Sequence, residues 1–164
     1  MLNERHNELV SAYKAGTLEC PEIRWHEQLS EIDLSLQPDK LHRKLLEENL
    51  SILPKVRLGK LVRWMSEADA AFFGRKKLYE YSSDQKTSRV LDLWQQGEKL
   101  IPPTILIYDQ QYMNLVRPTG IPSSELRPAD GKHRLAICCY FEVETIPILV
   151  LNRQLGLIKR VLKM

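Results

Sequence analysis

The residues best suited to chemistry lie in one stretch, Ala129–Ile137, which reads ADGKHRLAI. An extended, turn-rich segment ends there in Asp-Gly, and an amphipathic helix is predicted to begin directly after it. A helix start leaves about four backbone N–H groups without intrahelical partners and carries a partial positive charge, so it holds anions well. Gly131 lets the backbone approach a ligand closely because it has no Cβ.

Three further side chains in the first turn, those of Lys132, His133 and Arg134, are cationic or can donate hydrogen bonds. The helix dipole disfavours cations at this end, so their presence indicates an anionic ligand that offsets the cost. Phosphate is the natural candidate. The alternative is a simple Asp130-Gly131 turn followed by a solvated first turn.

Each side chain then has an expected role. Arg134 would hold two phosphate oxygens with its planar fork. His133 would donate to a phosphate or act as an acid or base near neutral pH. Lys132 would contribute charge as the phosphoryl group moves, and Asp130 would hold Mg²⁺ or orient His133.

The motif DGKHRLA, Asp130–Ala136, followed by IPILV, Ile146–Val150, resembles the DGHHRxxA…iPV signature of the ParB/sulfiredoxin-like superfamily. Weaker similarity upstream, over 97–107 and 55–62, extends the resemblance to about residues 54–152. The resemblance implies a small α/β fold in which the phosphates of a nucleotide rest on the helix start after the DGxHR turn.

Members of this superfamily differ in activity. Lys132 stands where sulfiredoxin has its nucleophilic cysteine, which argues against sulfinic-acid reduction. Gly131–Arg134 differs from the GERR-type motif of ParB in its second and third residues, which argues against chromosome segregation, and no DNA-binding domain is expected after the core. The free-serine kinases carry DGHHR, the nearest match, and need a carboxylate base, for which Glu125 and Asp130 are the candidates. A plasmid-borne conjugation inhibitor of the superfamily is a nucleotide hydrolase and nuclease.

The resemblance therefore implies an NTP-dependent phosphotransferase or NTP hydrolase, with nuclease activity as a further option, using ATP or another nucleotide and Mg²⁺. Two alternatives stay open: a non-catalytic module that binds nucleic acid such as DNA, and an interaction protein that binds a partner protein.

Composition bounds these options. At 164 residues the chain forms one domain, or one domain with an appendage. Residues 1–53 carry 6 Lys/Arg against 10 Asp/Glu, and residues 54–164 carry 18 against 11, so an acidic front joins a basic body. This split indicates intramolecular docking or contact with polyanions, or merely two solvated faces. No apolar run approaches the roughly 18 residues of a membrane span and no signal peptide is evident, so no membrane partner is expected.

The three cysteines form neither a disulfide framework nor a zinc pattern, which favours a reducing cytoplasm. Cys138 and Cys139 fall on the inner face of the predicted helix, where they are expected to be inert.

The expected fold is α/β, a mixed sheet with flanking helices (54–152), preceded by a helical appendage (1–53) and followed by a basic amphipathic helix (153–164). Hydrophobic periodicity and turn residues predict the individual elements. Helices are expected over 3–15, 25–36, 39–53, 67–80, 82–97 and 132–142, and strands over 56–62, 104–108, 112–116 and 146–151.

Residues 117–127 (RPTGIPSSELR) are predicted to be a loop because of their prolines, glycine and serine pair. Because the loop must end near Gly131, its polar side chains, including Glu125, could form a lid over the phosphate site. A plain connecting loop is an equal alternative.

Overall fold

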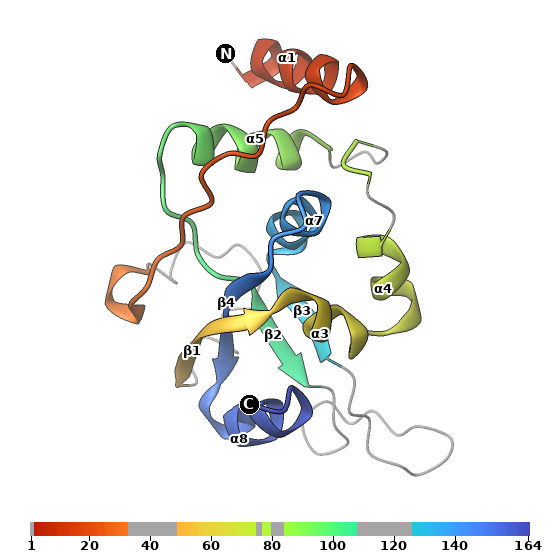
Figure 1. Cartoon of the computed structure of the whole chain (residues 1–164). Coiled ribbons are helices and arrows are strands. Elements are labelled where there is room, and N and C mark those ends of the chain that lie inside the picture. Colours follow the sequence, from red (N-terminus) through yellow and green to blue (C-terminus); the bar gives the residue numbers. More distant parts are fainter. Residues whose placement is uncertain (1, 33–48, 75–76, 80–83, 108–125) are drawn as a thin grey trace.

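A computed structural model describes residues 2–32, 49–74, 77–79, 84–107 and 126–164 of the chain. Within these residues the chain forms a four-stranded mixed sheet in the order β1-β4-β2-β3, flanked by helices (Figure 1). The strands are β1 (Leu50–Arg57), β2 (Thr104–Ile107), β3 (Leu126–Asp130) and β4 (Thr145–Leu151). The predicted α/β class with a mixed sheet is confirmed.

Strand directions alternate between antiparallel and parallel across the sheet. β1 pairs antiparallel with β4, β4 pairs parallel with β2 through Leu149 and Thr104, and β2 pairs antiparallel with β3. The register of β1 shifts between Leu53 and Val56, which pair with Ile148 and Ile146. Two residues of β1 therefore face one residue of β4 at this point, as in a β-bulge.

The helices surround this sheet. They are α1 (Leu2–Lys14), the short 3-10 helix η1 (Leu29–Glu31), α3 (Leu58–Arg63), α4 (Glu67–Gly74), α5 (Asp84–Gln95), α7 (Lys132–Tyr140) and α8 (Asn152–Val161). Figure 1 shows α1, α5 and α7 stacked above the strands and α8 below them. No helix among the described residues is long and apolar enough to cross a membrane.

Local capping chemistry explains where several helices begin and end. The Ser66 hydroxyl accepts the backbone N–H of Asp69 at 3.2 Å and so caps α4. α1 ends at Gly16 in the left-handed conformation, with φ of +71°, and Thr17 N–H donates to Ala12 O at 2.8 Å. Gly97, with φ of +84°, ends α5 in the same way. Only glycine adopts this backbone conformation without strain.

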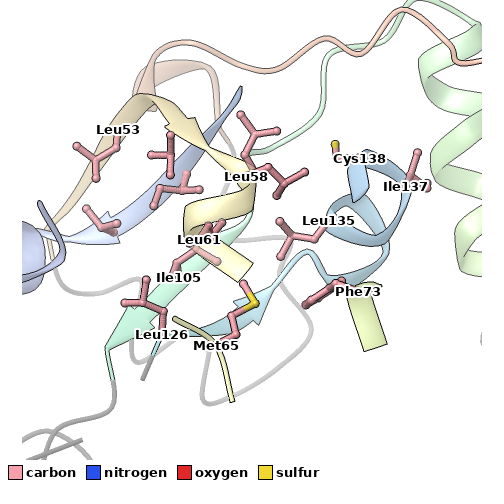
Figure 2. Close-up of a cluster of buried hydrophobic side chains, with 14 of the residues drawn as sticks. Leu53, Leu58, Leu61, Met65, Phe73, Ile105, Leu126, Leu135, Ile137 and Cys138 are labelled. Carbon is pink, nitrogen blue, oxygen red and sulfur yellow. The ribbon is translucent and has the colours of Figure 1, made fainter. Parts of the chain in front are cut away.

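The core forms where α7 and α3 meet the sheet (Figure 2). Leu135, Ile137 and Cys138 of α7 are fully buried, as is Leu61 of α3. They share one hydrophobic cluster with the strand residues Leu53, Ile105, Leu126, Ile146 and Ile148. Because Leu135, Ile137 and Cys138 are buried in the same cluster as the strand residues, α7 is held in place relative to the sheet.

α8 confirms the predicted basic amphipathic helix and packs on β4, β1 and β2. Its buried Gln154 accepts the backbone N–H of Ile107 at 2.9 Å and donates to the Ile107 carbonyl at 3.0 Å. The side-chain amide thus satisfies both backbone groups at the end of β2, as a neighbouring strand would.

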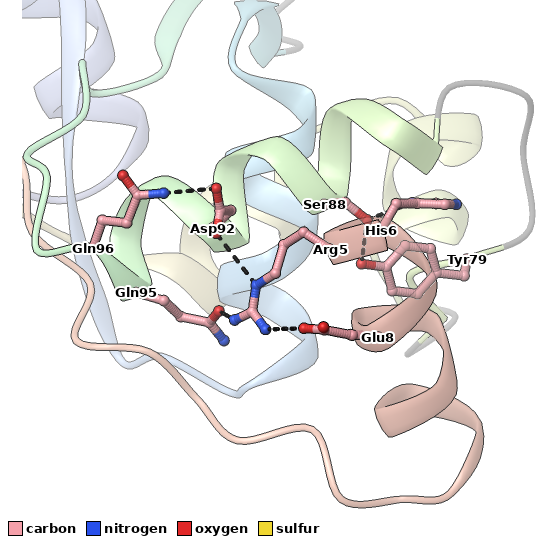
Figure 3. A network of polar contacts seen from close by, with 8 residues as sticks. All are labelled: Arg5, His6, Glu8, Tyr79, Ser88, Asp92, Gln95 and Gln96. Atoms are coloured by element: carbon pink, nitrogen blue, oxygen red, sulfur yellow. Dashed lines mark hydrogen bonds and ion pairs between the residues drawn. The ribbon is translucent and has the colours of Figure 1, made fainter. Parts of the chain in front are cut away.

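α1 docks on α5 through polar contacts (Figure 3). Arg5 donates to Asp92 Oδ1 at 3.3 Å and also contacts Glu8 and Gln95. His6 Nδ1 lies 2.6 Å from the hydroxyl of Ser88, a fully buried residue, and the Tyr79 hydroxyl lies 2.8 Å from the same oxygen. Ser88 therefore joins α1, α5 and residues 77–79.

Two predicted helices are wrong where the structure describes them. Trp25 lies in extended chain, forms a parallel β-bridge with Leu100 and packs its ring on Trp94, with centroids 5.2 Å apart. Only η1 is helical between residues 25 and 32, and 33–48 lie outside the described residues. The helix expected over 39–53 cannot extend to its predicted end, since Leu50–Leu53 begin β1 and pair with β4. The boundary expected after residue 53 thus falls inside β1.

Other boundaries also shift. The strand expected over 56–62 becomes the end of β1 followed by α3, and the helix expected over 67–80 is α4, with Lys77–Tyr79 non-helical. Leu126 and Arg127, assigned to the loop, belong to β3 and pair with Ile107 and Leu106. The strand expected over 112–116 and loop residues 117–125 lie outside the described residues.

We expect Ser88→Ala to lower the free energy of unfolding by about 1–3 kcal/mol, because it leaves His6 and Tyr79 without their shared partner. Urea unfolding measures the change. Ser11→Ala, on an exposed position of α1, is the matched control and should leave the midpoint almost unchanged. Equal midpoints for the two variants would contradict a structural role for the Ser88 contacts.

Candidate functional site

The predicted phosphate site begins at the turn between β3 and α7. Gly131 has φ of +90° and ψ of 23°, a left-handed conformation, and serves as the N-cap of α7. The N-cap makes no side-chain hydrogen bond. Leu135 N–H donates to Gly131 O at 2.9 Å, so the N–H groups of Lys132, His133 and Arg134 precede the first intrahelical bond. The turn therefore presents backbone donors without a side-chain cap.

Packing also requires glycine at this position. A Cβ on residue 131 would lie 2.9 Å from Pro103 Cα and 2.8 Å from Arg134 Nη2. Pro103 is itself buried, and its carbonyl accepts the N–H of Leu149 in β4 at 2.8 Å. Gly131 thus fits the turn against the sheet, in addition to any approach it offers to a ligand.

Arg134 lies back over the turn and pairs with Asp130. Its Nη2 donates to Asp130 Oδ2 at 2.9 Å, and the two side chains are 17% and 26% exposed. The Arg134 Nε is buried and has no hydrogen-bond partner among the described residues. The guanidinium therefore keeps donors beyond the one that Asp130 uses.

His133 contacts α5 rather than Asp130 in the described structure. Its Nδ1 lies 3.3 Å from the hydroxyl of Thr87, which is buried. Burial lowers the pKa of His133, Lys86, Arg134 and Lys132 lower it further, and Asp84 opposes them. The imidazole is therefore neutral at pH 7, with Nε2 left to accept a hydrogen bond or a proton when Nδ1 carries the hydrogen.

Lys132 forms an ion pair with a further acid, Asp69 of α4. Its Nζ lies 3.6 Å from Oδ1 of Asp69, the residue whose backbone Ser66 caps at the start of α4. The Asp69 side chain is 17% exposed, and α4 packs directly on α7. Asp69 is not among the site residues predicted from the sequence, because no local pattern indicates that α4 meets the DGKHR turn.

The structure thus brings together Asp130, Gly131, Lys132, His133 and Arg134, with Asp69 and Thr87 added from two other helices. Glu125, the other candidate base, lies outside the described residues, as does most of the predicted lid. No group of three His, Cys, Asp or Glu side chains suited to a metal occurs in the described parts of the chain. A Mg²⁺ ion here would need ligands from the phosphates as well.

Thiol chemistry is absent from this site. Burial raises the pKa of Cys138 far above that of a free thiol and raises the pKa of Cys139 to about 11. Both side chains are therefore protonated at neutral pH and unreactive, as their inward position predicted.

No protein-family model, curated protein or solved structure matches this chain. The resemblance to the ParB/sulfiredoxin-like superfamily remains a prediction, and the interpretation of the site depends on its geometry.

We expect the titration midpoint of His133, followed by NMR, to lie below the ordinary value near 6.5. Lys86→Gln should raise it, because a positive neighbour disappears, and Asp84→Asn should lower it further. Since the folded chain binds this proton less readily than the unfolded chain, His133 should reduce stability as pH falls below about 6.5. Arg160→Gln, on distant α8, controls for net charge. Shifts of the same sign in the Lys86 and Asp84 variants would refute this electrostatic explanation.

Proposed function

We propose that the chain binds a nucleotide by its phosphates at the start of α7 and acts as an NTP-dependent phosphotransferase or NTP hydrolase. The observation that carries this proposal is the uncapped helix start at Gly131, with Lys132, His133 and Arg134 in the adjoining turn. Backbone donors, helix dipole and cationic side chains converge there, which is the usual environment of a bound phosphate.

Both cations of the site are already paired with carboxylates, Lys132 with Asp69 and Arg134 with Asp130. An incoming phosphate must compete with these acids. Mg²⁺ is usually held by one or two carboxylates together with phosphate oxygens, so a metal–nucleotide complex would satisfy phosphate and carboxylates together. This pairing supports Mg²⁺ with ATP or another NTP as the bound form.

His133 is the proposed base. In hydrolysis, water would attack the terminal phosphorus and lose a proton to His133 Nε2, while the bond to the nucleoside diphosphate breaks. In phosphotransfer, an acceptor hydroxyl would replace the water. Thr87 holds the ring from the Nδ1 side, and Lys132 offsets charge on the transferred group. Asp130 and Glu125 remain the carboxylate candidates for the same role.

A second function, nucleic-acid binding, is favoured by one surface. A depression of about 150 Å³ is lined by Lys55, Arg57 and Lys60 together with Val56, Leu162 and Met164. Exposed Lys163 lies beside this lining in the sequence and adds a cation at the end of α8. No acid lines the depression in the described structure, so it suits a phosphate backbone.

The cysteines bear on the cytoplasmic location expected from the sequence. Cys20, Cys138 and Cys139 are all unpaired. We propose a reducing compartment, the cytoplasm, on this ground.

Arg134→Ala should raise the Kd of Mg²⁺–ATP in calorimetry by about 10- to 150-fold, because it removes a charge-assisted contact worth about 1.5–3 kcal/mol. Binding should persist, since the backbone donors remain. Arg134→Lys should recover only part of the loss, because an ammonium lacks the fork. Arg160→Ala is the matched control and should leave the Kd unchanged.

Two further variants separate metal binding from catalysis. Asp130→Asn should tighten ATP without Mg²⁺, since a competing carboxylate disappears, and weaken ATP with Mg²⁺. His133→Gln should reduce phosphate release more than affinity. Equal weakening by Arg134→Ala and Arg160→Ala, with both losses vanishing at high salt, would show diffuse polyanion binding and defeat the proposed site.

If nucleic acid is the ligand, the double variant Lys60→Gln/Lys163→Gln should weaken duplex DNA binding at low salt, because each phosphate contact releases counterions. Arg134→Ala should leave DNA binding unchanged. Gel-shift titrations at two salt concentrations make the comparison, and the opposite ranking would rule out the basic depression.

A further inference from the structure

A larger cavity lies away from α7, between the extended segment around Trp25 and the strands β1 and β4. It measures about 610 Å³, within the range of small-molecule sites. Three of its lining residues are cations, Arg24, Lys55 and Lys99, and one, Glu27, is an acid. Cations therefore outnumber acids among the lining residues that the structure describes.

The bulge in β1 creates one wall of this cavity. Leu53 pairs with Ile148 and Val56 with Ile146, so Pro54 and Lys55 together face Pro147. Side chains alternate between the two faces of a strand, and the buried Ile146 and Ile148 join the hydrophobic cluster. Pro147 and the bulge line the cavity instead. A bulge is a common device for redirecting a side chain, and here it brings Lys55 to the wall.

The opposite wall is held in place by the contacts of the extended segment. Leu100 N–H donates to Arg24 O at 3.0 Å, and His26 N–H donates to Leu100 O at 2.9 Å. The buried indole of Trp94 donates to the same Arg24 carbonyl at 3.0 Å and packs edge-to-face on Trp25. These contacts fix the Trp25 ring where it lines the cavity and place Lys99 beside it.

Lys55 and Lys99 differ from the cations of the α7 site, which are paired with carboxylates. Neither Lys55 nor Lys99 forms an ion pair or hydrogen bond with any described residue, although Lys99 is half-buried. Arg24 donates to the Gly97 carbonyl at 3.1 Å, which orients it without neutralising its charge. Within the part of the chain that the structure describes, these two ammonium groups, one on each wall, are therefore available to an anion without displacing a carboxylate.

We infer that this cavity is a second ligand site, which takes a small organic anion with a planar or apolar body and a phosphate or carboxylate group. The anionic group lies between Lys55 and Lys99, and the body lies against Trp25, Pro54 and Pro147. The volume exceeds what an inorganic ion needs, and the indole and prolines offer flat apolar surface to an organic body. This site is independent of nucleotide binding at α7 and shares no lining residue with it.

Phenyl phosphate and benzoate are suitable probes, followed by tryptophan fluorescence in a Trp64→Phe background that removes the exposed indole outside the cavity. We expect saturable binding of at least one probe at millimolar concentration. The two probes distinguish a phosphate from a carboxylate ligand. Inorganic phosphate and phenol, which each lack one half of the ligand, should bind more weakly than the preferred probe.

Lys99→Gln should raise the Kd of the preferred probe about tenfold, and Lys55→Gln/Lys99→Gln should raise it further. Neither lysine has a described partner, so both variants should fold as the parent does. The matched control, Lys159→Gln/Lys163→Gln on the end of α8, should leave the Kd unchanged, as should Arg134→Ala.

Four results would overturn the inference. They are the absence of saturable binding, equal affinity for phenol, an equal loss in the Lys159/Lys163 control, and a comparable loss in Arg134→Ala. The last result would place the probe at α7. Loss of ATP binding in Arg134→Ala with unchanged probe binding would support both sites separately.

Discussion

The close fit of the Gly131 turn against Pro103 determines how the elements around α7 are placed. A Cβ at residue 131 would lie within 3 Å of the Pro103 backbone, and the carbonyl of Pro103 accepts the N–H of Leu149. One buried proline therefore meets both the turn that starts α7 and the neighbouring strand β4. The Asp130–Arg134 pair spans the same turn at 2.9 Å and links the last residue of β3 to the first turn of α7. The direction in which α7 leaves the sheet follows from these contacts.

The other helices depend on that direction. α7 buries Leu135, Ile137 and Cys138 in the core and presents His133 to Thr87 of α5 and Lys132 to Asp69 of α4. α5 in turn receives α1 through Ser88 and Asp92. The N-terminal helix is thus connected to the site through α5, and Tyr13 of α1 also packs directly on Tyr140 of α7, with ring centroids 5.7 Å apart. A change in how α1 docks can reach His133 through α5 and Thr87.

Sequence reasoning succeeded where the signal is local. The DGK turn, α7, β4 and the basic amphipathic α8 follow from glycine, capping and periodicity within a few residues. It failed where contacts between residues far apart in the sequence determine the secondary structure. Trp25 has helical spacing to Leu29 and Ile32, yet its contact with Trp94 and pairing with Leu100 hold it extended. Leu50 and Leu53 continue a leucine pattern typical of a helix, but pairing with β4 makes them strand. The contribution of Asp69 and the cavity beside the bulge depend on tertiary packing, which no local pattern encodes.

The two sites differ in how their charges are balanced, and this difference bears on what each can select. At α7, Lys132 and Arg134 are paired with carboxylates, so bare phosphate gains only the difference between its own contacts and those it displaces. Mg²⁺ would change this balance, because it would bring positive charge to Asp69 and Asp130 as the phosphate took over their cations. The proposed α7 site therefore favours a metal–phosphate complex over the free anion. In the cavity, Lys55 and Lys99 have no described partner, so an anion there would displace no described carboxylate. The proposed cavity site would therefore bind its anion without a metal, and its selectivity would come from the indole and proline surface that receives the body of the ligand.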